Sequence, residues 1–154
     1  MFDYITVVSD EEYREAGKLF EEYARWLNID LSFQNFEEEL RSLKKMYIRP
    51  AGTIILCKNN DEYVGSVAVR PNEKGIAELK RMYVKPAFQK LKIGQGLLDL
   101  SIKFSIDAGY HKIRLDTLDH MIPAMNLYSK NGFYKIPPYY YNPEKNAVYF
   151  EKLL

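Results

Sequence analysis

The 154-residue chain has one cysteine, two histidines and almost no net charge. Cys57 alone excludes an intramolecular disulfide framework, and its place inside the strand-like run "TIILCK" indicates a small buried apolar residue rather than a reactive thiol. The two histidines stand apart from any cysteine or carboxylate cluster, so we expect no metal site. With 22 basic and 21 acidic residues, nothing in the overall charge favours nucleic acid, and an anion site must be local.

Long apolar runs are also absent. No stretch approaches the length that spans a bilayer, and no basic N-terminus precedes an apolar segment as in a secretory signal. We therefore expect a cytoplasmic protein with no membrane partner. No internal repeat or Gly/Ser linker divides the chain, which is 47% apolar and 28% charged, so the sequence predicts one globular domain spanning 1–154.

Hydrophobic periodicity predicts strands and helices in mixed order. A capping box of Ser9 and Glu12 marks the start of the first helix, which fades near Asn28. The predicted strands are 4–8, 52–58, 63–69, 75–84, 109–118, 133–136 and 147–154, and the helices are 9–28, 36–45, 94–109 and 122–131. Hairpins come first and a strand–helix–strand crossover follows. This order predicts an α/β fold with a mixed sheet, mostly antiparallel in its N-terminal half, and helices on both faces.

The strand 75–84 changes its inward face partway along. Apolar residues occupy odd positions up to Leu79 and even positions from Met82 onward, and the change falls at Lys80 and Arg81. Such a change is typical of a β-bulge, which would open the sheet there. A strand that is buried on both faces would give the same pattern, and spacing alone does not separate the two interpretations.

The segment "VKPAFQKLKIGQGLLDL" follows this strand and begins a helix. Free backbone N–H groups at a helix start, together with the helix dipole, favour a bound anion. Gly94 and Gly96 lack side chains that would block its approach, and Lys90 and Lys92 add positive charge. The segment is neither a Walker loop nor a dinucleotide fingerprint, because the required lysine–serine pair and third glycine are missing. By itself it fits an anion site and a solvated helix start equally well.

Two blocks, "ELKRMYVKPAFQKLKIGQGLL" and "LDTLDHMIPAMNLYSKNGF", resemble the core of the GNAT superfamily of acetyl-CoA-dependent N-acetyltransferases. The resemblance covers 75–135 closely. It implies the GNAT-like acyl-CoA N-acyltransferase fold with splayed central strands, acetyl-CoA as cosubstrate, and direct transfer of acetyl to a primary amine of a small molecule or peptide. Family analogy also favours a homodimer. No covalent enzyme intermediate is expected, because the lone cysteine is poorly placed as a nucleophile.

The resemblance also assigns a cofactor site. The family's pyrophosphate loop, Gln/Arg-x-x-Gly-x-Gly/Ala, falls on Gln89, Lys92 and Gly94, with Lys92 in place of the first glycine. Backbone N–H groups of Met82 and Val84 are implied to hold the oxyanion of the reaction. The implied cofactor-binding residues are Met82, Tyr83, Val84, Gln89, Lys90, Leu91, Lys92, Ile93, Gly94, Gln95, Gly96 and Asn126.

Two catalytic residues follow from the same resemblance. Tyr128 is implied as general acid, since a phenol with a pKa of about 10 stays protonated at neutral pH and can protonate the leaving thiolate. Its place on the apolar spacing of its helix equally suits a core residue. Glu78 is the candidate general base, and an ion pair with a neighbouring lysine or arginine is the alternative. The residues expected to line the acceptor entrance are Phe33, Gln34, Tyr139, Tyr140 and Tyr141.

A second class of function stays open beside the enzyme. The alternative is that the fold acts as a non-catalytic acyl-CoA-binding sensor module, and the departure at Lys92 is compatible with it. A nucleic-acid-binding role is weakened by the neutral net charge and by the absence of a basic stripe.

Overall fold

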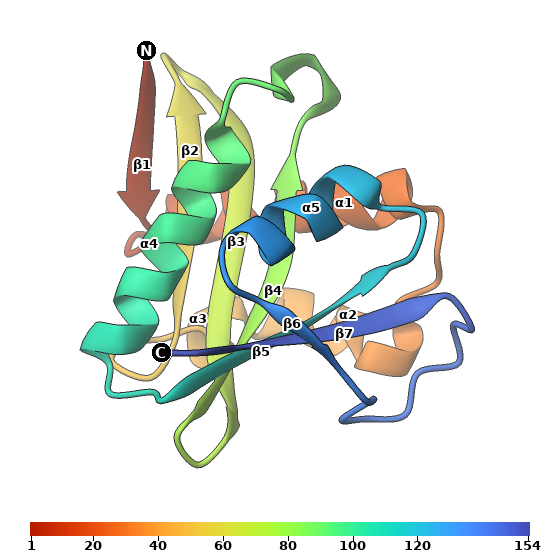
Figure 1. Ribbon diagram of the computed structural model, residues 1–154. Coiled ribbons are helices and arrows are strands. Elements are labelled where there is room, and N and C mark those ends of the chain that lie inside the picture. The colour runs from red at the N-terminus through yellow and green to blue at the C-terminus, as the bar shows by residue number, and fades with distance from the viewer.

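The computed structural model describes residues 1–154 and is built around one seven-stranded sheet in the order β1-β2-β3-β4-β5-β7-β6 (Figure 1). The strands are β1 (Phe2–Thr6), β2 (Thr53–Asn59), β3 (Glu62–Glu73), β4 (Ile76–Val84), β5 (Lys112–Leu118), β6 (Tyr134–Ile136) and β7 (Ala147–Leu153). The helices are α1 (Asp10–Leu27), α2 (Phe36–Arg41), α3 (Leu43–Met46), α4 (Ile93–Asp107) and α5 (Ile122–Lys130), with single 3-10 turns η1 (Ser32–Gln34) and η2 (Pro86–Phe88). Only β4 and β5 pair in parallel, which confirms the predicted mixed sheet and its crossover.

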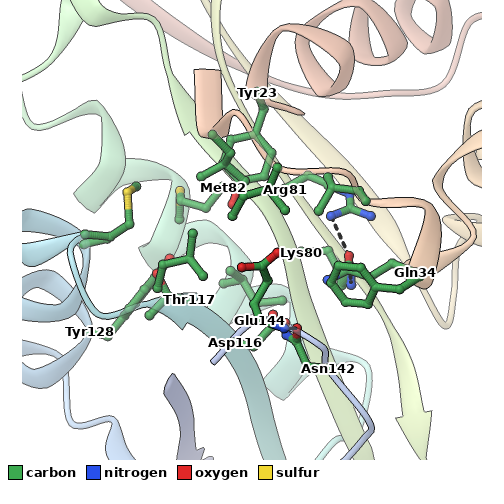
Figure 2. Close-up of a pocket in the computed structure, with 18 residues that line it drawn as sticks. Tyr23, Gln34, Lys80, Arg81, Met82, Asp116, Thr117, Tyr128, Asn142 and Glu144 are labelled. Atoms are coloured by element: carbon green, nitrogen blue, oxygen red, sulfur yellow. Dashed lines mark hydrogen bonds between the residues drawn. The ribbon is translucent and has the colours of Figure 1, made fainter. Parts of the chain in front are cut away.

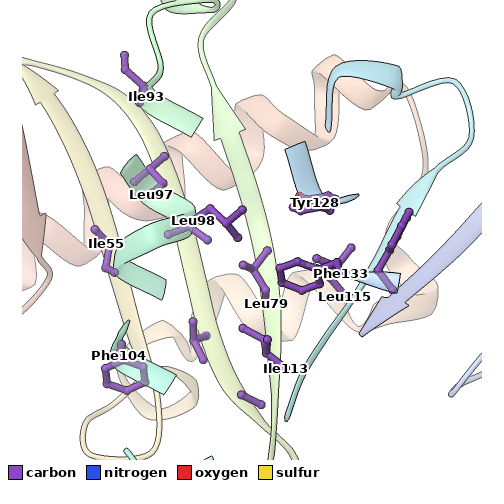
Figure 3. Close-up of a cluster of buried hydrophobic side chains, with 14 of the residues drawn as sticks. Ile55, Leu79, Ile93, Leu97, Leu98, Phe104, Ile113, Leu115, Tyr128 and Phe133 are labelled. Carbon is purple, nitrogen blue, oxygen red and sulfur yellow. The ribbon is translucent and has the colours of Figure 1, made fainter. Parts of the chain in front are cut away.

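Helices cover both faces of the sheet, as expected. On one face α4 and α5 enclose an apolar cluster that includes Leu97, Leu98 and Tyr128 (Figure 3). On the other face α1 and α3 pack over a second cluster through residues such as Phe20 and Leu43. Cys57 is fully buried in the sheet, in the first cluster. None of the helices is both long and apolar enough to cross a membrane.

Local signals account for most element boundaries. The Ser9 hydroxyl accepts from the Glu12 amide at 3.1 Å, and the Glu12 carboxylate accepts from the Ser9 amide at 2.9 Å, so the capping box begins α1 as predicted. The predicted helix at 36–45 is wrong in one respect, because it breaks at Ser42 into α2 and α3. Ser42 has a non-helical φ of −127°, and its amide donates to the Glu39 carbonyl at 3.0 Å, three residues back, which interrupts the helical pattern of bonds four residues back.

A β-bulge interrupts the pairing of β3 with β4. Ala68 pairs with Lys80, but Ser66 pairs with Tyr83, so β4 carries an extra residue. Arg81 takes a positive φ of 56° there, and its carbonyl accepts the Ser66 hydroxyl at 3.0 Å. The change of face read from the sequence therefore reflects a bulge.

The two central strands separate just before this bulge. β4 pairs with β5 only from Ile76 to Glu78, opposite Lys112 to Arg114. Beyond that point β4 continues beside β3 and β5 continues beside β7, and the ribbons diverge in Figure 1. The sheet is thus splayed at its centre, and the edge of β4 that faces β5 is open beyond Glu78.

Candidate functional site

A cavity of about 80 Å³ lies where β4 and β5 part (Figure 2). That volume admits a few waters or a small chemical group. Its walls come from α1, η1, β4, β5, α5 and the segment before β7. The polar groups among its lining residues are Tyr23, Gln34, Lys80, Arg81, Asp116, Thr117, Tyr128, Asn142 and Glu144. Its apolar lining includes Leu27, Ile29, Leu31, Phe33, Met82, Leu118 and Met121.

Tyr128 lies on α5 and borders the cavity on the side opposite Gln34 (Figure 2). It is 5% exposed, and its ring packs on Phe133 and Phe150 with centroids 5.6 and 6.1 Å apart. Both sequence interpretations therefore describe it, since it is a core residue that also lines the cavity. Burial, followed by the nearby Tyr23 and Asp116, raises the pKa of Tyr128 well above its usual value. The phenol stays protonated at neutral pH and is available as a donor.

Glu78 is the last residue of β4 that pairs with β5, is 3% exposed and does not line the cavity. One carboxylate oxygen accepts from Arg70 Nε at 3.0 Å and the other from the Tyr139 hydroxyl at 2.7 Å. Burial alone would raise the pKa of Glu78, but the charges of Lys80 and Arg70 outweigh it and lower that pKa. A carboxylate with both oxygens bonded and a lowered pKa is a weak base. The geometry therefore favours the ion-pair alternative for Glu78.

Asp116 is one of the polar cavity residues that the sequence interpretation missed, together with Lys80 and Glu144. It lies on β5, two residues beyond the last pair with β4, and its carboxylate accepts the Tyr140 hydroxyl at 2.9 Å. An aspartate inside the strand directly after the crossover was the available signal. Strand alternation predicts that it faces away from the core, but the separation from β4 turns that position into a cavity wall.

The bulge places Lys80 and Arg81 on the same face of the sheet. Arg81 donates through Nε and Nη2 to the Glu39 carboxylate at 3.0 and 2.7 Å, and through Nη1 to Gln34 Oε1 at 2.9 Å. Lys80 Nζ donates to the same Gln34 oxygen at 3.1 Å. The Gln34 amide nitrogen donates in turn to the Tyr140 hydroxyl at 3.0 Å. One network thus joins the bulge, η1 and the loop before β7.

The predicted acceptor-lining residues divide into two groups. Phe33 and Gln34 line the cavity, as their loop position suggested. Tyr139 and Tyr140 are not among the lining residues. Their hydroxyls donate to the carboxylates of Glu78 and Asp116 instead. Tyr141 is 82% exposed and lies outside the cavity.

Free amides gather at the start of α4. The first bond within that helix joins the Gly96 amide to the Lys92 carbonyl at 3.2 Å, so the amides of Ile93, Gly94 and Gln95 make none there. No side chain caps this end. A helix start with unpaired N–H groups suits a phosphate.

The two glycines have different reasons to lack a side chain. A Cβ on Gly94 would meet only the Leu127 side chain, at an ordinary 3.5 Å, so its outer face is open. A Cβ on Gly96 would collide with the Tyr4 ring, and its amide is already bonded. The sequence predicted that both glycines permit close approach of an anion. In the structure only Gly94 has both an open outer face and a free amide.

Other predicted cofactor residues occupy the loop and the strand before it. Lys90, Leu91, Lys92 and Asn126 are exposed, and Met82 and Val84 are half-buried on the α4 side. Three have other contacts for their side chains: Tyr83 donates to Glu22 at 2.7 Å on the opposite face, Ile93 is in the core, and Gln95 pairs with Asn131. Gln89 donates to the Val84 carbonyl at 3.2 Å and ties the loop to β4.

Lys92, where the resemblance expects glycine, takes a left-handed backbone with φ of 64°. That conformation costs a residue with a Cβ about 1 kcal/mol. We expect Lys92→Gly to be about 1 kcal/mol more stable than Lys92→Ala, measured by urea denaturation. The alanine variant is the control, since it removes the same charge and keeps the strain. Equal stability of the two variants would show that the loop is not strained at this position.

The sequence model of the acetyltransferase (GNAT) family matches residues 18–133 of this chain. These residues include the separated strands β4 and β5, the start of α4, and α5. An uncharacterized N-acetyltransferase of Schizosaccharomyces pombe is 40% identical over 135 residues, which are 85% of this chain and 82% of that protein. Both likenesses extend well beyond the two blocks singled out in the sequence.

Solved structures share the fold. A GNAT-family acetyltransferase of Staphylococcus aureus superposes with a TM-score of 0.82 at 23% identity, over 99% of each chain. The PaiA N-acetyltransferase of Thermoplasma acidophilum, crystallised with coenzyme A, superposes with a TM-score of 0.78 at 19% identity, over 100% of this chain and 99% of that one. At these identities the likeness shows the architecture alone, and it confirms the predicted fold class.

Proposed function

Because the chain belongs to the GNAT family of acetyltransferases, we propose that it transfers an acetyl group from acetyl-CoA directly to a primary amine. The observation that carries this proposal is the cavity between the parted strands, which has a protonated phenol on one side and carboxylates on another. Transfer to an amine needs a donor for the leaving thiolate and a group that takes up the amine proton. Tyr128 and Asp116 meet these two needs in one cavity.

The start of α4 is the proposed seat of the coenzyme A diphosphate. The unpaired amides of Ile93, Gly94 and Gln95 donate to it, and the lysines of the preceding loop add positive charge. The bare outer face of Gly94 permits the approach. Coenzyme A in the PaiA relative supports the choice of cosubstrate, and exposed Asn126 lies on the adjacent helix as the resemblance expects.

The proposed reaction uses the open edge of β4. Backbone N–H groups of Met82 and Val84, on the side that β5 no longer pairs, stabilise the oxyanion that forms when the amine attacks the thioester carbonyl. As the new C–N bond forms and the C–S bond breaks, Tyr128 protonates the departing sulfur. The amine proton passes to Asp116, which lines the cavity, in preference to Glu78, which does not.

Tyr128→Phe tests the acid role. We expect kcat to fall roughly 100-fold, because the thiolate must leave without its proton donor. The affinity for coenzyme A should stay the same, since the phenol ring and its packing on Phe133 are kept. Steady-state kinetics and calorimetry measure the two quantities.

Tyr110→Phe is the matched control. It also removes a hydroxyl hydrogen bond, to the Ala51 carbonyl at 2.6 Å, but lies outside the cavity, so its kinetics should match the wild type. Unchanged turnover in Tyr128→Phe with a good acceptor would remove Tyr128 from the acid role.

Acetyl transfer itself is tested by mixing the protein with acetyl-CoA and a panel of primary amines. Free thiol release and the mass of the acetylated product report turnover. We expect turnover with at least one amine. Coenzyme A binding without turnover on any amine would favour the sensor interpretation.

A further inference from the structure

Lys80 is a buried cation that borders the cavity with most of its hydrogen-bonding capacity unused. It is 5% exposed, and its one hydrogen bond runs from Nζ to Gln34 Oε1 at 3.1 Å. That oxygen is shared with Arg81, so it gives Lys80 only part of a neutral acceptor. An ammonium has three N–H donors, and those left over are available to whatever occupies the cavity.

The two carboxylates whose charges act on Lys80 are Glu78 and Asp116. Glu78 forms its ion pair with Arg70 at 3.0 Å, and Asp116 accepts the Tyr140 hydroxyl at 2.9 Å. No carboxylate lies within 4.0 Å of Lys80 Nζ among the ion pairs of the structure. Burial, followed by the charge of Arg81, lowers the pKa of Lys80, and the charges of Glu78 and Asp116 only partly offset this lowering. Such lowering marks an ammonium that lacks a sufficient counter-charge.

Besides Lys80, the cavity lining includes carboxylates and many apolar side chains. Asp116 and Glu144 bring carboxylates to its lining, while Leu27, Ile29 and Phe33 make it largely apolar. A ligand with two ammonium groups would leave Lys80 without a counter-charge and add repulsion to it. A ligand with an ammonium, a carboxylate and a small apolar body satisfies all three parts of the lining.

We propose that the acceptor is an amine that also carries a carboxylate, as amino acids do, and that Lys80 binds that carboxylate. Asp116 and Tyr128 then face the amine, and Gln34 holds Lys80 in place. Lys80 is on this account a specificity-determining residue. The inference rests on the proposed acetyl transfer and adds the chemical class of the substrate to it.

The test compares each acid with its own amide. Glycine, alanine and β-alanine are assayed against glycinamide, alaninamide and β-alaninamide. For each compound kcat/KM is expressed per concentration of the unprotonated amine, whose fraction is determined by titration. We expect the wild type to prefer at least one acid over its amide by roughly 10- to 100-fold, the range for a hydrogen bond to a charged group. Lys80→Met keeps the apolar stem and should reduce this ratio to near one.

Two further variants make the result specific. Lys80→Arg keeps the positive charge and should keep a preference for the acid. Lys103→Met removes an exposed lysine of α4, whose side chain is 71% exposed, and should leave the ratio unchanged. If Lys80→Met fails to fold, the ratio of kcat/KM for an acid to that for its amide, measured in the wild type and in Lys80→Arg, still tests the role of Lys80.

Direct binding separates this inference from the proposed function. The same pairs are titrated into the protein saturated with coenzyme A, and binding is followed by calorimetry. Acetylation of amines with no preference for any acid overturns the role of Lys80 and leaves acetyl transfer standing. Binding of an acid but not its amide, without turnover, overturns acetyl transfer and leaves carboxylate recognition standing. If no acid is either bound or acetylated, this inference is overturned.

Discussion

Gly94→Val is expected to weaken coenzyme A binding roughly 100-fold or more while the protein stays folded. A valine side chain would add bulk beside the unpaired amides of Ile93, Gly94 and Gln95, which are proposed to hold the diphosphate, and would hinder its close approach. The loss of more than one hydrogen bond to a charged group accounts for the size of the effect. Calorimetric titration with coenzyme A measures it.

The fold should tolerate this change because the Cβ added at Gly94 meets only the Leu127 side chain, at 3.5 Å. Gly96→Ala is the contrasting control, since its Cβ would collide with the Tyr4 ring. Those Tyr4 atoms are the outer end of a partly exposed side chain that can rotate away, and the Gly96 amide is already bonded, so we expect the alanine variant to bind coenzyme A much more tightly than Gly94→Val does. A valine variant that bound coenzyme A as tightly as the wild type would place the diphosphate elsewhere.

The fold could be predicted from the sequence because its signals are local. The capping box of Ser9, the hairpin between β2 and β3 and the periodicity of α4 each depend on residues close together in the chain. Even the bulge could be seen in the sequence, because the apolar residues of β4 change from odd to even positions at Lys80. Helix propensity did not show the break at Ser42, because serine is only slightly unfavourable inside a helix and the break lies in the backbone of this one residue.

The site could be predicted only where it lies on a continuous segment. The loop sequence before α4 predicted the free amides at the start of that helix. The block "LDTLDHMIPAMNLYSKNGF" pointed to Tyr128. The cavity chemistry depends on contacts between distant residues: Gln34 meets Tyr140 across 106 positions, and Glu39 meets Arg81 across 42. Nothing local distinguishes Glu39 from the glutamates beside it, and Asp116 gains its place only because β4 separates from β5.

Glu39→Gln is expected to lower the free energy of unfolding by about 3 to 5 kcal/mol. Glu39 is 1% exposed and accepts from Arg81 twice, at 3.0 and 2.7 Å, and from the Tyr47 hydroxyl at 3.0 Å. The glutamine keeps the shape of the side chain but leaves the Arg81 guanidinium, 5% exposed, without its counter-charge. Urea denaturation at neutral pH measures the loss.

The same ion pair predicts a pH dependence. Burial alone would raise the pKa of Glu39, but the hydrogen bonds and charge of Arg81 outweigh it, so the folded pKa is lowered. A lowered folded pKa means that the stabilisation is present above the unfolded value of about 4.3 and is lost as the pH falls through the folded value. The difference between wild type and Glu39→Gln should therefore be constant near neutrality and shrink below roughly pH 4.

Glu38→Gln provides the control on the same helix. Glu38 pairs with Arg41 at 3.0 Å, but their side chains are 65% and 66% exposed, so the change should leave stability within the error of the measurement. The double variant Glu39→Leu/Arg81→Met should recover much of the loss, because it removes both charges together. If Glu39→Gln destabilised the protein no more than Glu38→Gln, Arg81 would not depend on Glu39. The bulge, and with it the shape of the cavity around Lys80, would then be held by other contacts.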